Sequence, residues 1–218
     1  MSNTEDPCQV AEAAFEKTWH ESLIDYAQRR INSEKCLQAS LYAGLRAKLS
    51  NEFRVFVEAT IWLPDGKRQS IDLLICHGKL VVSAIELKYK PKAKIHNIGM
   101  YADINKLLNL RNYRAKSESI NIEIRRYVGD SKKDKESFKF APDRRIIFGA
   151  YCQNDDIQAT LFWKTHRASL SAPASSRRTP PPRLMICLAR TDASLAVLSQ
   201  MVGGKSIKAT TERIAIDA

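Results

Sequence analysis

Three charged side chains stand inside two apolar segments of the chain. Asp72 lies in the segment SIDLLI at residues 70–75, and Glu86 and Lys88 lie in AIELK at residues 84–88. Both segments have the pattern of buried strands, where charged side chains are rare unless they pair or bind a metal. Because side chains alternate between the faces of a strand, Glu86 and Lys88 point the same way. Two carboxylates and an ammonium at this spacing are suited to hold a hard divalent cation and to position a water molecule beside it.

The turn between the two segments decides whether Asp72 joins the other two charges. Residues 77–79 (HGK) fit a three-residue turn, because the central glycine tolerates positive φ. That turn places Asp72 opposite Ala84, and Asp72 and Glu86 then share a face of the antiparallel pair. A two-residue turn would send Glu86 to the other face. The metal site therefore requires an odd-length turn or a β-bulge.

The order of these residues is itself informative. Asp72, then thirteen residues, then Glu86-Leu87-Lys88 resembles the signature of the PD-(D/E)XK (restriction-endonuclease-like) nuclease superfamily. The resemblance covers residues 34–152, with Ile71 in place of proline before the first acid. It implies a metal-dependent endonuclease that hydrolyses DNA phosphodiester bonds in restriction, repair or defence against foreign DNA. The alternative is a solvated hairpin with an ordinary Glu–Lys pair, and the apolar residues beside each charge argue against it.

Each residue of the motif has an expected role. Asp72 and Glu86 are expected to bind Mg²⁺ or Mn²⁺, since magnesium takes a few carboxylates and keeps several waters. Lys88 is expected to orient or help deprotonate the attacking water and to stabilise charge on the phosphate. The resemblance adds the backbone carbonyl of Leu87 as a further metal ligand. It also adds Glu34 as a fourth catalytic residue, on the helix before the sheet.

Several polar residues near the motif have two interpretations. Glu34 shares a helical stripe with Gln38, so it either faces the sheet or is only an acid stabilised at a helix N-terminus. Gln38 is a weaker candidate for a supporting group. Glu58 lies in an expected strand and either lines the site or points to water. Asp103 and Lys106, three residues apart on an expected helix, favour a surface ion pair over substrate contacts.

The charge balance indicates a polyanionic partner. The chain has 35 Lys and Arg against 24 Asp and Glu, a net charge of +11, although solubility alone also accounts for such a surplus. Lys90, Lys92 and Lys94 continue the alternation of Lys88 and are expected to contact nucleic-acid phosphates. A third basic cluster, at residues 177–183, is equally well explained as a solvated loop. Between it and the lysine run lies a second basic stretch, which contains Arg125, Arg126, Lys132, Lys133, Lys135, Lys139, Arg144 and Arg145.

Composition limits the classes of protein to consider. With 218 residues, 44% of them hydrophobic and 27% charged, the chain is expected to form one soluble globular domain. No apolar run approaches the roughly 18–20 residues of a membrane span, and the polar N-terminus does not resemble a signal peptide. Five cysteines without regular spacing indicate reduced thiols and a cytoplasmic location. No nucleotide-binding loop or nucleophile elbow is present in the sequence.

The periodicity predicts an α/β fold. Its mixed β-sheet of four or more strands is flanked by helices, in the restriction-endonuclease-like order α-β-β-β-α-β. A strand that returns through the helix at 96–114 should be parallel to the strand before it. The expected helices cover residues 6–31, 34–50, 96–114 and 193–202, the expected strands 53–62, 70–76, 80–89, 145–152, 160–163 and 184–188, and residues 115–143 are expected to be a loop or an insertion.

Three parts of one domain are expected. Residues 1–31 form an N-terminal helical extension, 32–152 the nuclease-like core, and 153–218 the strands and helix that complete it. The expected partner is nucleic acid, with DNA favoured over RNA and no membrane. A homodimer would suit cleavage of both DNA strands. Two other functions stay open: a non-catalytic nucleic-acid-binding module, and a subunit that acts only within a larger assembly.

Overall fold

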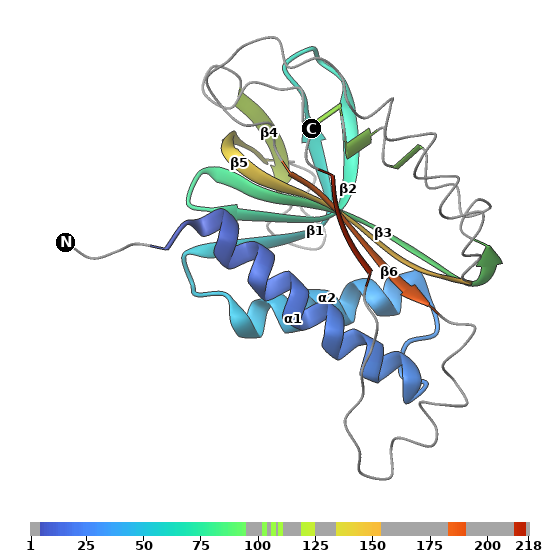
Figure 1. Cartoon of the computed structure of the whole chain (residues 1–218). Coiled ribbons are helices and arrows are strands. Elements are labelled where there is room, and N and C mark those ends of the chain that lie inside the picture. The colour runs from blue at the N-terminus through green and yellow to red at the C-terminus, as the bar shows by residue number, and fades with distance from the viewer. Residues whose placement is uncertain are drawn as a thin grey trace.

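The computed structural model describes most of the first half of the chain and part of the second. The described residues are 5–94, 102–103, 106–107, 109–110, 119–124, 134–153, 183–190 and 212–216. Figure 1 shows two helices on the same side of a twisted sheet. The elements in chain order are α1 (Pro7–Ala27), α2 (Glu34–Lys48), β1 (Phe53–Trp62), β2 (Arg68–His77), β3 (Leu80–Lys94), β4 (Ser119–Ile124), β5 (Asp134–Gln153), β6 (Arg183–Arg190) and β7 (Glu212–Ile216).

The strands form one mixed sheet in the order β3-β2-β1-β4-β5-β6-β7, with an additional pairing of β3 and β5. β1, β2 and β3 pair antiparallel, whereas β3 with β5 and β5 with β6 pair parallel. The first part of the long strand β5 also pairs antiparallel with β4, which in turn pairs with the end of β1. The predictions of an α/β fold, of a mixed sheet and of a parallel return strand are therefore confirmed.

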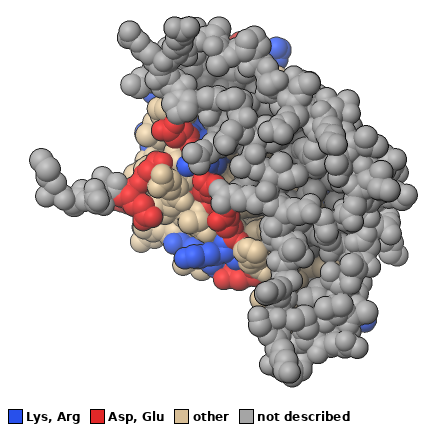
Figure 2. All heavy atoms as spheres, in the orientation of Figure 1, with Lys and Arg blue, Asp and Glu red and all other residues tan. Residues whose placement is uncertain are grey.

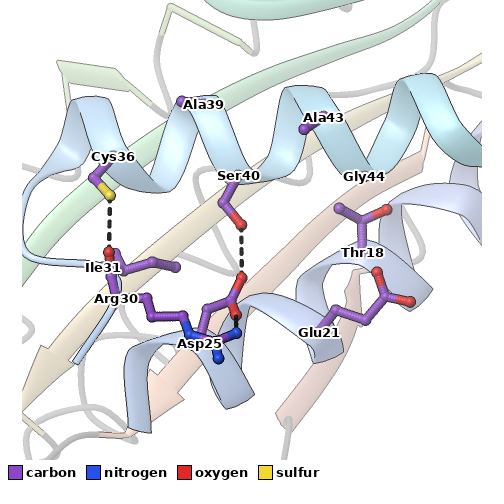
Figure 3. Close-up of a pocket in the computed structure, with 10 residues that line it drawn as sticks. All are labelled: Thr18, Glu21, Asp25, Arg30, Ile31, Cys36, Ala39, Ser40, Ala43 and Gly44. Carbon is purple, nitrogen blue, oxygen red and sulfur yellow. Dashed lines mark hydrogen bonds and ion pairs between the residues drawn. The ribbon is translucent and has the colours of Figure 1, made fainter. Parts of the chain in front are cut away.

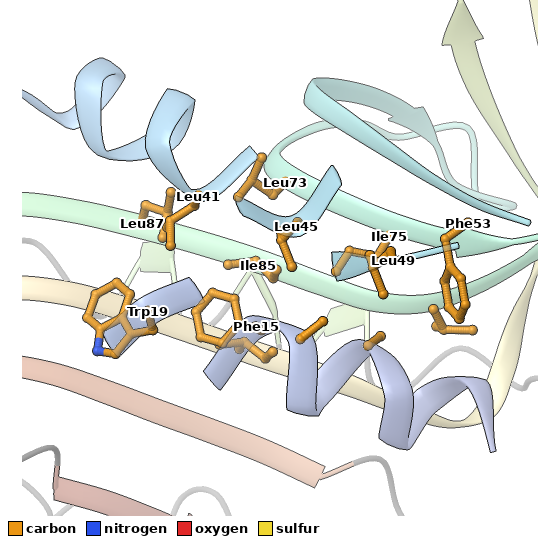
Figure 4. Packing of buried hydrophobic residues seen from close by; sticks show 14 of the residues in the cluster. Phe15, Trp19, Leu41, Leu45, Leu49, Phe53, Leu73, Ile75, Ile85 and Leu87 are labelled. Atoms are coloured by element: carbon orange, nitrogen blue, oxygen red, sulfur yellow. The ribbon is translucent and has the colours of Figure 1, made fainter. Parts of the chain in front are cut away.

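The helices bury one face of the sheet in what we call the helix-side core. Ser33 is the N-cap of α2, and its side chain accepts a hydrogen bond from the Cys36 backbone N–H. The buried leucines of α2 recur at four-residue steps and face β2 and β3. Figure 4 shows the packing of this core. Its fully buried members include Phe15, Trp19, Leu37, Leu41, Leu45, Leu73, Ile75, Ile85, Leu87 and Ile147.

α1 packs closely against β5 within this core. The ring of Trp19 lies over Gly149, where an added Cβ would be 2.8 Å from a ring carbon of the tryptophan. Trp19 is 1% exposed, so it has no room to move away. α1 was expected as an extension of the core, and in the structure its apolar side chains belong to the same core as those of α2.

The opposite face of the sheet forms a second core. β4 and the first part of β5 fold over this face, and the helical residues Leu107 and Leu110 are buried in it. These two leucines belong to the helix expected over 96–114, of which the structure describes residues 102–103, 106–107 and 109–110. Other buried members are Ile61, Leu63, Ile71, Leu74, Cys76, Ile120, Ile122, Phe138, Phe140, Ile146 and Phe148.

In β1 and in β2, the alternation of side chains between the two cores is reversed halfway along the strand. Buried side chains of the first half of β1 pack mainly in the helix-side core, and those of its second half pack in the second core. Glu58, with a φ of 47°, lies between the two halves. In β2, Ile71 is buried in the second core and Leu73 in the helix-side core. Asp72 lies between these two and opposite Glu58 in the register, where the pairing is interrupted. The irregularity places Asp72 at the boundary of the two cores.

Three sequence expectations differ from the structure. The loop expected over 115–143 is wrong at 119–124 and 134–143, which form β4 and the first half of β5. Those segments alternate buried apolar and exposed polar residues, a period-two pattern hidden by their many charges. β7 was not foreseen, and the helices end at Ala27 and Lys48, earlier than expected. The strand expected at 160–163 and the helix expected at 193–202 lie outside the described residues.

Candidate active site

The hairpin that carries the motif has a shorter turn than the sequence suggested. His77 pairs with Leu80, so the turn contains two residues. The three-residue turn that would place Asp72 opposite Ala84 is therefore wrong. The glycine of the turn has a φ of 55°, as expected of the position.

A β-bulge in β3 restores the convergence of the acids. The register shifts by one residue between Ile75 and Cys76 of β2, and the extra residue lies in β3. Leu73 lies opposite Ile85 as a result, and no pair beyond this one is formed between these two described strands. Asp72 and Glu86, the next residues on the two strands, stand together where the ladder ends. The bulge was one of the two geometries that the metal site required.

Side chains satisfy the main chain where β2 and β3 separate. Asp72 Oδ2 accepts a hydrogen bond of 2.7 Å from the Leu87 N–H, and Gln38 Nε2 donates one of 2.9 Å to the Asp72 carbonyl oxygen. Two residues further along β3, the Tyr89 N–H donates to Glu34 Oε2 at 3.1 Å. α2 thus contacts both strands at the point where they part. We call the residues Glu34, Gln38, Asp72, Glu86 and Lys88 the fork site.

Two ion pairs connect the fork site to the helical residues on the other face. Lys106 Nζ lies 2.7 Å from Glu86 Oε1, and Lys88 Nζ lies 2.9 Å from Asp103 Oδ2. Asp103 and Lys106 do not form the surface pair with each other that their spacing suggested. Each instead pairs with a residue of β3. The sequence held one signal for this, since both polar residues share a helix turn with the buried Leu107.

Burial and mutual repulsion raise the pKa of both acids. Glu86 is 2% exposed, and this burial, with the neighbouring charge of Asp72, raises its pKa to about 8 against the opposing effect of Lys106. Burial also raises the pKa of Asp72, although the hydrogen bond from Leu87 works the other way. Both carboxylates are therefore costly to ionise together unless a cation is close. This is the electrostatic setting of a cation site.

Lys88 has the opposite balance. Burial works to lower its pKa, but the pKa is raised overall because Asp103, Glu34 and Asp72 surround the ammonium with negative charge. Glu34 is one of these charges, and its carboxylate accepts a hydrogen bond of 3.1 Å from the N–H of Tyr89, the residue after Lys88. The acid expected from the helix thus lies at the fork site.

The donor atoms of the fork site suit a magnesium ion. Asp72 and Glu86 offer carboxylate oxygens, and the Leu87 carbonyl leaves β3 on the same edge as its N–H, which points at Asp72. Mg²⁺ needs only one or two carboxylates when waters and phosphate oxygens fill its other positions. Within the described ranges, no three acidic, histidine or cysteine side chains are gathered as a complete ligand set. An ion at the fork site would take its remaining ligands from water or from a bound phosphate.

The basic residues divide between surface and core. Lys90 is exposed beyond the fork site, and the main chain of β3 extends through Lys92 and Lys94, whose side chains lie outside the description. Arg144 and Arg145, which end the second basic stretch, are 1% and 6% exposed. Arg144 donates to the carbonyls of Ala141 and Leu110, and Arg145 pairs with Glu12 at 2.6 Å. These two arginines stabilise the core and are unavailable to phosphates.

A separate hollow lies between α1 and α2 (Figure 3). Its acids have partners, since Asp25 accepts hydrogen bonds from Ser40 and Arg30, and Glu21 pairs with Lys48. None of the fork-site side chains lines it. In Figure 2 the described surface on this side carries acidic side chains beside basic ones, a mixture unlike the lysine run of β3. Neither observation supports placing the functional site in this hollow rather than at the fork site.

No family model, curated protein or solved structure matches the chain. Its function is therefore inferred from the geometry of its own residues. Among the described helices, none combines the length and apolar character needed to cross a membrane.

Proposed function

We propose that the protein is a metal-dependent nuclease that hydrolyses DNA phosphodiester bonds with a restriction-endonuclease-like core. The observation that supports this is the fork site itself. It gathers Glu34 from α2, Asp72 from β2, and Glu86 and Lys88 from β3, at the point where two strands separate. The sheet also agrees with the expected core, since β1 pairs with β2, β2 with β3, and β3 runs parallel to β5.

Each residue has a defined task in this proposal. Asp72, Glu86 and the Leu87 carbonyl would hold Mg²⁺ or Mn²⁺ against a phosphate. The bound ion supplies polarisation of the phosphodiester and a water of lowered pKa. Lys88 orients the attacking water and stabilises the charge that develops on the phosphate oxygens. Glu34 fixes the course of β3 through the Tyr89 N–H and adds a third negative charge near the ion.

Binding of DNA is assigned to the strand beyond the fork site. Lys90, Lys92 and Lys94 follow Glu86 on β3, and a net charge of +11 favours a polyanion. DNA bound along β3 by these lysines would have a phosphate close to Lys88. DNA is favoured over RNA on the resemblance of the motif alone.

The test is incubation of the protein with linear DNA, circular DNA and RNA, each with Mg²⁺, Mn²⁺ or chelator. We expect cleavage of DNA with either metal and none with chelator. Cutting of the circular form identifies an endonuclease. Cleavage that continues undiminished in chelator would exclude the metal mechanism. Divalent metal should also raise the melting temperature, because it relieves repulsion among the three acids.

Two variants separate chemistry from binding. Lys88→Ala should lower the turnover of bound DNA far more than its affinity, because Lys88 acts on the reacting phosphate. Glu86→Gln should remove cleavage while the fold is kept, as judged by circular dichroism. Lys79→Ala is a matched control, since this lysine pairs with Glu136 at the distant turn of the same hairpin.

A non-catalytic nucleic-acid-binding module is the second candidate. It is favoured by one observation, namely that Glu86 and Lys88 are already paired with Lys106 and Asp103. This candidate predicts DNA binding that is unchanged by chelator, and no cleavage with any divalent ion.

A further inference from the structure

The helical residues on the far side of β3 form a crossed set of contacts with the motif. Lys106 reaches Glu86 at 2.7 Å, while Asp103, three residues before it, reaches Lys88 at 2.9 Å. Each pair joins a positive to a negative charge, one in each direction. A single helical segment therefore neutralises both the acid and the base of the motif.

The Glu86 carboxylate depends on Lys106 to compensate its negative charge. Its side chain is 3% exposed, so water cannot compensate a negative charge there. Asp72 lies beside it and adds repulsion. Among the described residues, Lys106 is the cation in contact with this carboxylate, whereas Lys88, on the same face of β3, is held by Asp103.

A divalent ion and the Lys106 ammonium would compete for the same carboxylate. An ion held jointly by Asp72 and Glu86 would lie within a few ångströms of the ammonium, and two cations at that distance in a poorly hydrated site repel strongly. The Lys106 side chain is 27% exposed and can move its flexible stem toward solvent. Exchange of the two cations therefore needs no rearrangement of the sheet.

We propose that Lys106 is a built-in competitor of the divalent ion, which occupies the cation position on Glu86 and thereby weakens the affinity of the fork site for metal. In this role Lys106 acts through its ion pair with Glu86 and does not itself touch the metal or the substrate. The inference deepens the proposed function and rests on it. Loss of the ammonium leaves two adjacent acids without a cation, so the site then binds a divalent ion more tightly and the metal-free protein is less stable.

The test is the affinity for Mn²⁺ alone, measured without nucleic acid by the paramagnetic resonance signal of free Mn²⁺. We expect Lys106→Met to bind Mn²⁺ about tenfold more tightly than the wild type. Lys106→Arg keeps a cation in place and should stay near the wild-type affinity. Lys106→Gln, which keeps a hydrogen-bond donor without the charge, serves if the methionine variant does not fold. The metal-free melting temperature of the neutral variants should fall and recover with Mn²⁺.

Two control variants distinguish competition from general charge effects. Lys79→Met removes a lysine–glutamate pair at the hairpin turn, so it should leave the affinity for Mn²⁺ unchanged. Lys90→Met removes an exposed positive charge from β3 and should have a much smaller effect than Lys106→Met. Equal effects of Lys90→Met and Lys106→Met would overturn the inference.

The remaining outcomes separate the inference from the proposed function. Wild-type binding of Mn²⁺ that is lost in Asp72→Asn locates the ion at the fork site. If such binding is present but Lys106→Met leaves it unchanged or weaker, the inference is wrong and the nuclease proposal stands. If Asp72→Asn has no effect on Mn²⁺ binding, the ion is not at the fork site and both are overturned. If neither the wild type nor Lys106→Met binds Mn²⁺, the inference is overturned, and the cleavage assay decides the nuclease proposal.

Discussion

The carboxylate of Asp72 accepts a hydrogen bond of 2.7 Å from the backbone N–H of Leu87, the residue between Glu86 and Lys88. A side chain of one strand thus replaces the main-chain partner that the next residue of the ladder would have supplied. Because Leu87 is fully buried, its N–H requires this acceptor. Asp72 is therefore needed by the fold as well as by the proposed chemistry, and the two needs can be separated by substitution.

Asp72→Asn should abolish cleavage while it preserves most of the stability. The amide oxygen of asparagine still accepts from Leu87, but the negative charge for the metal is removed. We expect activity to fall at least about a hundredfold. Asp72→Ala should lose activity and in addition about 1–3 kcal/mol of unfolding free energy, because the buried N–H is left without a partner. Denaturant unfolding and a cleavage assay measure both, and equal stability of the two variants would contradict the account.

Neutralising Lys90, Lys92 and Lys94 together should weaken DNA binding without changing the turnover of bound DNA. Every lysine that neutralises a phosphate in the wild type should, once substituted, reduce the slope of log K against log salt by about 0.9. Binding titrations at several salt concentrations give this slope. An unchanged slope in the triple variant would show that the lysine run does not touch the phosphates.

The metal-free protein should lose stability as the pH rises from about 5 to about 8. The pKa of Glu86 lies near 8 in the folded state, above the ordinary value of 4.5, because of burial and the charge of Asp72. The folded protein therefore binds more protons than the unfolded chain in this window, and its unfolding free energy falls by up to about 1.4 kcal/mol per pH unit. Glu86→Gln should flatten this dependence. A wild-type stability that increases over the same range in chelator would contradict the assignment.

Gly149→Ala should destabilise the fold by about 1–3 kcal/mol. The new methyl group would lie 2.8 Å from the buried ring of Trp19. Trp19→Phe removes the ring atoms in question, so the glycine substitution should cost less in that background. A double-mutant cycle by thermal unfolding measures the coupling. Additive effects of the two substitutions would show that the close approach is relieved elsewhere.

The local signals in the sequence were sufficient for the first helices and strands. Alternation and helical periodicity identified α1, α2 and β1 through β3. The motif residues were identified as charged side chains inside apolar strands. This pattern can be recognised without knowing the length of the turn. The contact of Glu34 with β3 agrees with one of the two interpretations of the stripe on α2, namely that this acid faces the sheet.

The remaining features depend on contacts between distant parts of the chain. The bulge in β3 has no local marker, because its residues are ordinary apolar strand formers. The buried roles of Arg144 and Arg145 come from carbonyl and carboxylate partners on other elements. Lys106 and Asp103 were paired with each other because helix spacing is visible in a sequence, whereas an approaching strand is not.

Two backbone amides of β3, those of Leu87 and Tyr89, can report on the state of the fork site, because each donates a hydrogen bond to one of its acids. The Leu87 N–H is bonded to the carboxylate of Asp72, and the Tyr89 N–H to that of Glu34. The NMR chemical shifts of these two amides therefore respond to anything that changes the charge on either acid. Occupancy of the site can be followed in this way on an inactive variant, residue by residue, without a substrate.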